Sequence, residues 1–157
     1  PLMTVPGWVE GDLLLTESVA ICERIAGCGP LVVAADEADH WAYRNWLHRA
    51  DATLTFPLAV VLRYTRVEPP DRRLAQAAED YRAFFGGRAR TIEAALADGR
   101  EWLVAGRFTL ADIAVGYAAF LACSVGAEAA LGDATRRWLD RCTARPAFTR
   151  ARARQAA

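Results

Sequence analysis

The sequence predicts a mainly α-helical protein with a small α/β part at its start. In the first 26 residues, two short apolar runs flank a turn and are followed by a helix signal. After residue 30, four segments carry apolar residues at helical spacing with start and stop signals around them. Together these segments predict a helical bundle, over residues 39–55, 71–96, 109–123 and 134–143.

The opening residues predict a strand, a turn, a second strand and a helix. Trp8-Val9 and Leu13 to Leu15 read as strands, and Glu10-Gly11-Asp12 between them is a turn signal. Ser18 fits the N-cap of a helix that Gly27 ends. This part is too small to stand alone, so we expect it to dock on the helices.

Proline and glycine punctuate the rest of the chain. Gly29-Pro30 starts a linker, and Pro57 is expected to kink or end the helix over 39–55. Pro69-Pro70 cannot lie inside a helix, so a loop and a fresh helix start are expected there. Gly86-Gly87 costs the second helix about 1 kcal/mol per glycine relative to alanine, which favours a bend.

The strongest local signal is a helix start at residue 109. Thr109 fits the N-cap, and Asp112 three residues later can return a hydrogen bond, which is a capping box. Phe108 and Ile113 have the spacing of a hydrophobic staple. Residues 113–123 are apolar on nearly every face and too few to span a bilayer, which predicts a buried core helix.

Several stretches resemble one protein family. Residues 101–112, which include the capping box, resemble the capping segment of the helical domain of cytosolic glutathione transferases. Residues 5–21, with Val-Pro and then Thr-Glu-Ser, resemble the latter half of their thioredoxin-like, glutathione-binding domain, in bacterial-type members. Residues 145–148 are similar to the family's C-terminal segment. The resemblance implies half of a thioredoxin-like domain over 1–30 and an all-α domain over 31–157.

The resemblance also implies a glutathione site. A helix N-terminus offers free amides and a partial positive charge to a carboxylate. In the family, the residue matching Ser18 holds the γ-glutamyl carboxylate and the one matching Glu17 its ammonium. The residue matching Val5 pairs through its main chain with the cysteinyl part, held by a cis bond to the proline matching Pro6.

A second substrate would enter an apolar cleft between the two domains. In the family this cleft accepts a small apolar electrophile, and such pockets are concave and mostly apolar. Most aromatic residues of the helices must pack in the core. We expect Tyr43, Trp46 and Tyr117 near the cleft, although the sequence does not identify the electrophile.

The function implied is a glutathione transferase that adds the glutathione thiolate to an electrophile, with glutathione as cosubstrate. In the family, a tyrosine, serine or cysteine near the domain's start activates the thiol. That β-α-β unit would precede Pro1, so we expect the sequence to lack it, and we assign no catalytic residue. Two alternatives stay open: a noncatalytic binding or interaction module, and a glutathione-dependent thiol reductase or isomerase. The resemblance also implies a homodimer.

Composition points to a soluble cytoplasmic protein. The formal net charge is zero, lysine is absent, and arginines are spread along the helices, so neither nucleic acid nor membrane is expected as a partner. Cys22 and Cys123 lie in apolar runs and are expected to be buried as small hydrophobes, whereas Cys28 is expected to be exposed. No metal site is expected, because His40 and His48 are two turns apart and the four cysteines lack zinc-site spacing.

Overall fold

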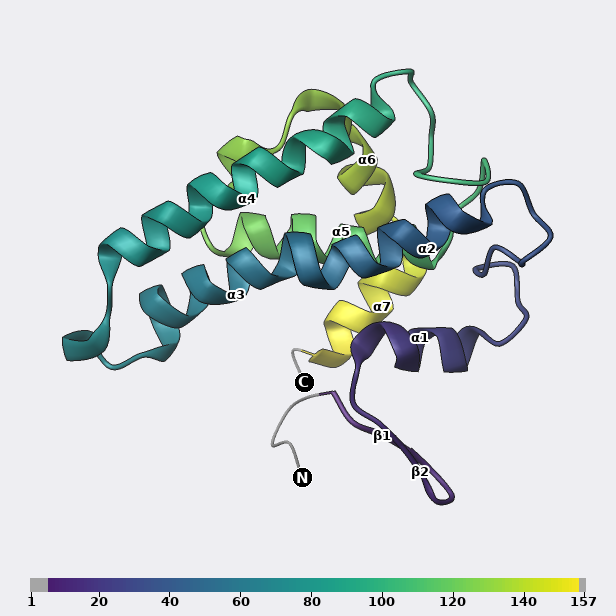
Figure 1. The fold of residues 1–157 in the computed structure, drawn as a ribbon, viewed down its shortest axis with the longest axis horizontal. Helices are drawn as coiled ribbons and strands as arrows, with labels where there is room; N and C mark the ends of the chain where they lie inside the picture. Colours follow the sequence, from purple (N-terminus) through teal and green to yellow (C-terminus); the bar gives the residue numbers. More distant parts are fainter. Residues whose placement is uncertain (1–5, 156–157) are drawn as a thin grey trace.

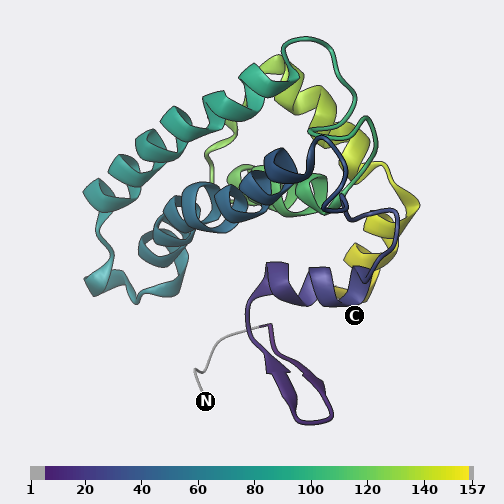
Figure 2. The same cartoon turned by 45° about the vertical axis from the view of Figure 1, so that its right-hand side comes forward.

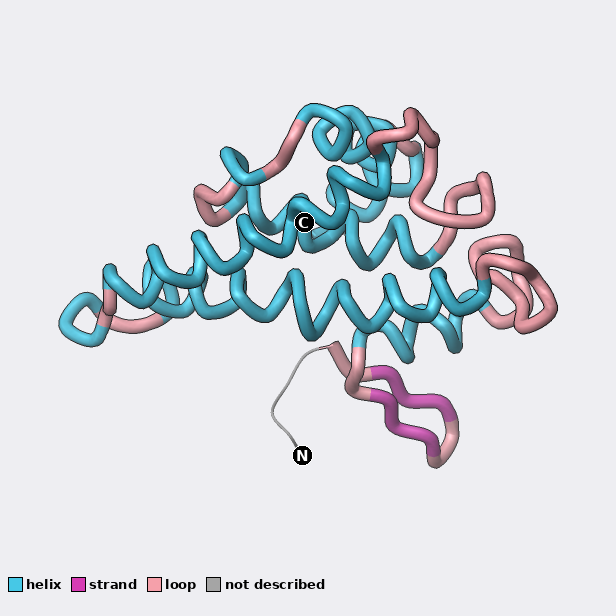
Figure 3. The backbone as a smooth tube through the Cα atoms, turned by 45° about the horizontal axis from the view of Figure 1, so that its top comes forward, coloured by secondary structure: helices cyan, strands magenta, loops and turns pink. Residues whose placement is uncertain are grey.

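A computed structural model of the protein describes residues 6–155, and Figure 1 shows a mainly helical chain. A two-stranded sheet stands at its start, and the regular elements of the rest of the described chain are helices joined by loops. The predicted fold class, mainly α with a small α/β part, is confirmed. Two long helical segments lie side by side and enclose the core together with a third helix, α5 (Figures 1 and 3).

The two strands form a hairpin that projects from the helical body (Figures 1 and 2). Strands β1 (Trp8–Glu10) and β2 (Leu13–Leu15) are antiparallel. Gly11 turns the chain with a φ of 57°, a conformation that glycine adopts without a steric penalty. Val9 is 71% exposed and Leu14 is 59% exposed, so the expectation that the whole opening docks on the helices is wrong for the hairpin.

Helix α1 (Ser18–Ala26) does dock on the helices. Val19, Cys22 and Ala26 pack against the core. The helix ends at Gly27, as predicted, and this glycine has a φ of 55°. The predicted start is off by one residue, because Glu17 occupies the N-cap position and Ser18 already belongs to the first turn.

The next helical segment runs without a break from residue 40 to residue 67 and alternates between α and π geometry. Its parts are α2 (His40–Arg49), η1 (Ala50–Thr55), α3 (Phe56–Leu62) and η2 (Arg63–Val67). The expectation that the helix ends near residue 55 is therefore wrong. Pro57 lies in the first turn of α3, directly after the π-helical segment η1. The wider π turn accommodates the missing amide proton of proline without ending the helix.

Helix α4 (Ala75–Leu96) is the longest in the described chain. It starts four residues later than predicted, because a single 3₁₀ turn, η3 (Pro70–Arg72), and an extended Leu74 precede it. The loop before it is held by Glu68, whose carboxylate pairs with side chains of the flanking arginines. Gly86-Gly87 does not interrupt α4, which is assigned as one helix throughout.

Helix α5 (Leu110–Ser124) crosses the middle of the bundle, as predicted for a core helix. One of its faces is nevertheless uncovered, because Ile113 is 38% exposed and Tyr117 is 57% exposed. The prediction of a helix buried on every side is therefore corrected. The buried residues of α5 are Leu110, Ala111, Asp112, Val115, Gly116, Ala118, Ala119 and Ala122.

The predicted capping box is present at the start of α5. The Thr109 amide donates to Oδ2 of Asp112 at 2.9 Å, and the Ala111 amide donates to the Thr109 hydroxyl at 3.2 Å. Asp112 is 0% exposed, and its Oδ1 also accepts from the Leu103 amide at 3.0 Å and from Trp138 Nε1 at 2.9 Å. Burial raises the pKa of Asp112, and these hydrogen bonds oppose that shift. The capping box therefore also joins α5 to the preceding loop and to α6.

The C-terminal helices are α6 (Asp133–Thr143), after the short 3₁₀ turn η4 (Glu128–Ala130), and α7 (Pro146–Gln155). The start of α6 is capped from another helix. Glu93 of α4 accepts hydrogen bonds from the Thr135 amide and hydroxyl, at 2.9 and 2.7 Å. Helix α4 and helix α6 are thereby fixed together.

Arg107 fastens the linker that follows α1. Its guanidinium donates to both carboxylate oxygens of Glu37, each at 2.7 Å, and to the main-chain oxygens of Pro30 and Val32. The hydrogen bond from Arg107 is the main reason that the pKa of Glu37 falls from 4.5 to about 2. The linker is therefore held to the loop before α5 by a charged, two-pronged contact.

This contact predicts a pH dependence of stability. Because folding lowers the pKa of Glu37, its contribution is fully present above pH 4.5 and is lost as the pH falls towards about 2. We expect Glu37→Gln to lower the melting temperature at neutral pH and to differ little from the parent near pH 2. A calorimetric melting series across this range tests it. An equal deficit at both ends would contradict the assignment.

The four cysteines are free, and two of them, Cys22 and Cys123, are less buried than expected. Cys142 is buried, Cys22 is half-buried and Cys28 is exposed, the last as predicted. Cys123 was expected to be buried but is exposed, because it lies outside the buried face of α5. No helix among the described residues is long and apolar enough to cross a membrane.

Candidate functional site

A cavity of about 630 Å³ opens where α1 meets α5 and the helical segment over residues 40–67, at α2 and η1. Its lining is mostly apolar, with a few polar side chains from α1 and from η1. This is the common composition of a small-molecule site. The residues that line it are Pro6, Ser18, Val19, Cys22, Leu47, Asp51, Thr55, Leu110, Ile113, Ala114 and Tyr117.

The start of α1 opens on this cavity with its amides free of side-chain caps. Glu17 has the extended backbone of an N-cap residue, but no side chain among residues 6–155 caps the helix there. The first main-chain bond of the helix runs from the Ile21 amide to the Glu17 oxygen, at 2.9 Å. Because Ser18 and Val19 line the cavity, the free donors and the partial positive charge of the helix start lie at its edge.

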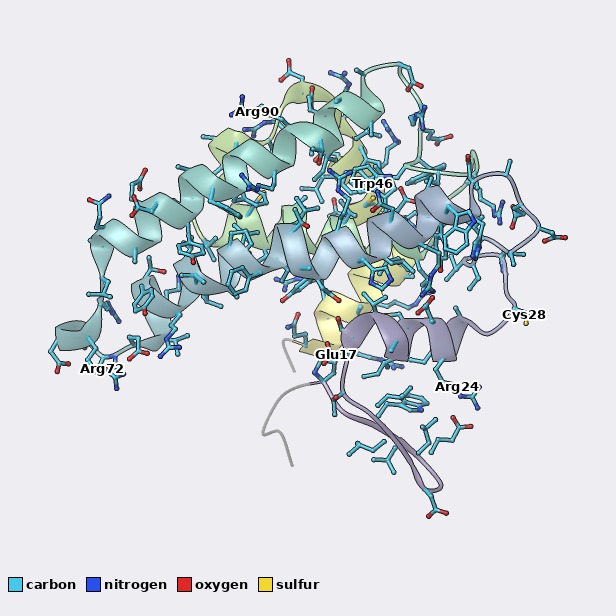
Figure 4. The ribbon with its side chains drawn as sticks, in the orientation of Figure 1. Glu17, Arg24, Cys28, Trp46, Arg72 and Arg90 are labelled. Atoms are coloured by element: carbon cyan, nitrogen blue, oxygen red, sulfur yellow. The ribbon has the colours of Figure 1, made fainter. Side chains whose placement is uncertain are left out.

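The structure gathers three of the four predicted glutathione-binding residues at this place. Pro6 and Ser18 line the cavity, and Glu17 stands beside Ser18 at the start of α1, where Figure 4 labels it. Both Glu17 and Ser18 are exposed. Val5 lies outside the described residues.

Of the three aromatic residues expected near the second substrate, the structure places one at the cavity. Tyr117 lines it, from the uncovered face of α5. Tyr43 is 1% exposed and Trp46 is 7% exposed, and both belong to the core, so their placement in a pocket is corrected. They lie on the face of α2 that packs into the bundle. Burial, with a contribution from Glu23, raises the pKa of Tyr43 to about 12.

Cys22 lines the cavity as a thiol. Burial raises its pKa, and the nearby carboxylates of Asp51 and Glu23 raise it further. Because the thiolate is the reactive form, these surroundings make Cys22 a poor nucleophile. Within the described residues, no group of three or more His, Cys, Asp or Glu side chains is arranged to hold a metal ion.

Sequence reasoning missed Asp51 and Thr55, which η1 presents to the cavity. Leu47, Asp51 and Thr55 are spaced four residues apart, so they share one side of the helical segment over residues 40–67. The only sequence signal for this position was that Asp51 lies one helical turn after the apolar residue Leu47. It is weak, because the π-helical geometry that positions both residues cannot be read from composition.

A second apolar cavity of about 410 Å³ lies between α5, α6 and α7. Ile113 and Tyr117 line both cavities, so the uncovered face of α5 joins them. Arg145 also lines this second cavity, with its guanidinium 3.7 Å from the centre of the Phe108 ring. Arg145 and Phe108 thus make a cation–π contact at its edge.

Several solved structures have a similar fold. Glutathione transferase F7 from Populus trichocarpa superposes on this chain with a TM-score of 0.77, at 20% sequence identity. The match covers 94% of this chain and 73% of the F7 chain. The chain has the glutathione transferase fold. Ure2p5 from Phanerochaete chrysosporium, cocrystallised with 1-(S-glutathionyl)-2,4-dinitrobenzene, gives a TM-score of 0.81 over 92% of this chain and 70% of its own, at 22% identity.

Ure2p in complex with glutathione superposes with a TM-score of 0.75 at 23% identity, over 89% of this chain and 70% of its own. No protein-family profile matches the sequence, and no curated protein matches it. The resemblance to glutathione transferases that the three sequence stretches indicated is thus confirmed as a shared fold.

Proposed function

We propose that the protein binds glutathione and takes part in adding its thiolate to a small apolar electrophile. The observation that carries this proposal is the start of α1, which no side chain of the described residues caps and which opens on an apolar cavity of about 630 Å³. One end of this arrangement suits a carboxylate and the other suits an apolar group. Glutathione transfer requires both ends in one site.

The residues divide the two substrates between them. The Ser18 hydroxyl and the first amides of α1 take the γ-glutamyl carboxylate, and the Glu17 carboxylate takes the ammonium. The main chain of Val5, before Pro6, pairs with the cysteinyl part. The electrophile fills the apolar part of the cavity, beside Ile113 and Tyr117 of α5.

The reaction is a displacement or addition at carbon. The glutathione sulfur, as a thiolate, donates an electron pair to the electrophilic carbon. In a displacement a leaving group departs with the pair of the bond that breaks, whereas in an addition the π pair of the attacked double bond moves to the neighbouring atom, which takes a proton from water. Ionisation of the thiol beforehand requires a group that lowers its pKa. We assign no described residue to that role, since Cys22 and Tyr43 both have raised pKa values.

The start of α1 at the apolar cavity also favours a second candidate function, a noncatalytic glutathione-binding module with this fold. The two candidates share the glutathione site and differ in turnover. Mixing the purified protein with glutathione and 1-chloro-2,4-dinitrobenzene separates them, because transfer produces the absorbing conjugate and binding alone does not. Ure2p5 with its bound dinitrobenzene conjugate and Ure2p with glutathione support the shared site by similarity of fold.

Replacing Ser18 by alanine tests the glutathione site. A hydrogen bond to a carboxylate contributes about 1.5 kcal/mol, so we expect Ser18→Ala to weaken glutathione binding about tenfold. Isothermal titration calorimetry measures it. Ser124→Ala, at the far end of α5, removes a hydroxyl outside this cavity and serves as the matched control. Equal affinity of Ser18→Ala and the parent would sink the assignment.

The proposal includes a cytoplasmic homodimer that detoxifies electrophiles. An exposed aromatic cluster across α3 and α4 supports the dimer. Phe56 is 53% exposed and Phe84 is 42% exposed, and both rings pack on Tyr81. Light scattering at micromolar concentration should give twice the chain mass for the parent, and Phe84→Glu should lower it. A monomeric parent would contradict the dimer.

A further inference from the structure

One residue of the cavity has a charge that the proposed function does not use. Asp51 is the one ionisable carboxyl, and the one residue carrying a formal charge, among the described residues that line the cavity. The remaining lining residues are apolar or neutral, and none of them is arginine or histidine. A fixed negative charge on an otherwise apolar wall acts on whatever ligand fills the space.

The backbone of η1 explains why Asp51 faces the cavity. The Phe56 amide bonds to the Asp51 oxygen five residues back, which is the π-helical pattern. Ala50 and Leu54, its neighbours in η1, are 0% exposed and hold the core side of the turn. Asp51 and Thr55 are thereby directed to the other side, and single π turns often occur at functional sites.

The surroundings of Asp51 concentrate negative charge at the cavity. Burial raises the pKa of Asp51, and the carboxylate of Glu17 raises it further, while His48 lowers it. Glu17 stands at the start of α1 beside Ser18, where the proposed function pairs its carboxylate with the glutathione ammonium, so Asp51 is the carboxylate that bound glutathione does not pair.

We propose that Asp51 makes the electrophile pocket select uncharged or cationic apolar compounds and reject anionic ones. This inference rests on the proposed glutathione site and names the substrate class of that site. Asp51 is exposed as a whole residue, so its carboxylate repels an anionic substituent in the cavity through a partly hydrated wall, and the repulsion is strongest at low salt. A cationic or neutral substituent meets no such repulsion.

The test uses three S-benzylglutathione conjugates that differ in the para substituent of the benzyl group: methyl, trimethylammonium and carboxylate. Because all three carry the same glutathione part, the ratio of their affinities isolates the electrophile pocket. Binding is measured by calorimetry at about pH 8 and low salt. The measurement does not depend on turnover, so it also applies to a noncatalytic protein.

We expect the carboxylate conjugate to bind at least about fivefold more weakly than the trimethylammonium conjugate. Asp51→Asn should bring this ratio towards one, and Asp71→Asn, an exposed acid on η3 away from the cavity, should leave it unchanged. The parent's ratio should also shrink at high salt, which tests the same charge without any substitution. Equal affinities in the parent, or an unchanged ratio in Asp51→Asn, would overturn the proposal.

Failure of the proposed function gives a different result. If neither glutathione nor the methyl conjugate binds, the glutathione site is wrong and the inference falls with it. If both bind and the charged conjugates are not distinguished, the glutathione site stands and the role of Asp51 alone is rejected.

Discussion

Asp112→Ala is expected to lower the free energy of unfolding by about 4 kcal/mol. The carboxylate of Asp112 accepts hydrogen bonds from the Thr109 amide, the Leu103 amide and Trp138 Nε1, all within 3.0 Å and fully buried. Removing it leaves these donors without a partner and opens a void at the start of α5. An unsatisfied buried donor costs about 1–3 kcal/mol, and loss of a cap adds about 1.

Urea unfolding followed by circular dichroism measures this loss. Asp71→Ala is the matched control, because Asp71 is an exposed acid for which a change within about 0.5 kcal/mol is expected. A midpoint for Asp112→Ala that coincides with the control would show that the buried hydrogen bonds contribute little. The account of α5 as the centre of the bundle would then need revision.

Glu93→Ala is expected to cost about 2 kcal/mol. Glu93 caps a helix to which it does not belong, since Gly132 at the N-cap of α6 has no side chain. Its carboxylate accepts from the Ala134 amide at 3.0 Å and from the Thr135 amide and hydroxyl at 2.9 and 2.7 Å. Burial raises its pKa, but these hydrogen bonds outweigh it and the pKa is lowered overall.

The comparison variant for Glu93 is Glu79→Ala on the same helix. Glu79 is exposed and pairs with Arg82 three residues on, an interaction that contributes a few tenths of a kcal/mol. Both variants lose one glutamate from α4, so helix propensity cancels. If Glu93→Ala unfolded at the same urea concentration as Glu79→Ala, the hydrogen bonds from α6 to Glu93 would contribute nothing to the free energy of unfolding.

Much of the fold could be predicted because its signals are local. The capping box at Thr109 needs residues three apart, and the hairpin needs a turn between two apolar runs. Gly27 ends α1 because few other residues adopt its backbone conformation. These features depend on neighbours in sequence, and the structure has them.

The features that were missed depend on packing between distant segments. A proline normally ends a helix, but Pro57 follows the π turn of η1, and the helix continues through it. Tyr43 and Tyr117 are both tyrosines on apolar helices, and the packing of the bundle alone decides that one is buried and the other lines the cavity. The same π turn places Asp51 at the cavity, and no sequence pattern predicted this π turn.

Calorimetric titration of the protein with glutathione tests the central claim most directly. The matched ligand is the α-linked tripeptide Glu-Cys-Gly, which has the same composition but presents a different carboxylate and ammonium to Glu17 and Ser18. We expect saturable binding of glutathione with a dissociation constant below about 1 mM, and much weaker binding of the α-linked peptide. No binding of glutathione, or equal binding of both peptides, would contradict the account.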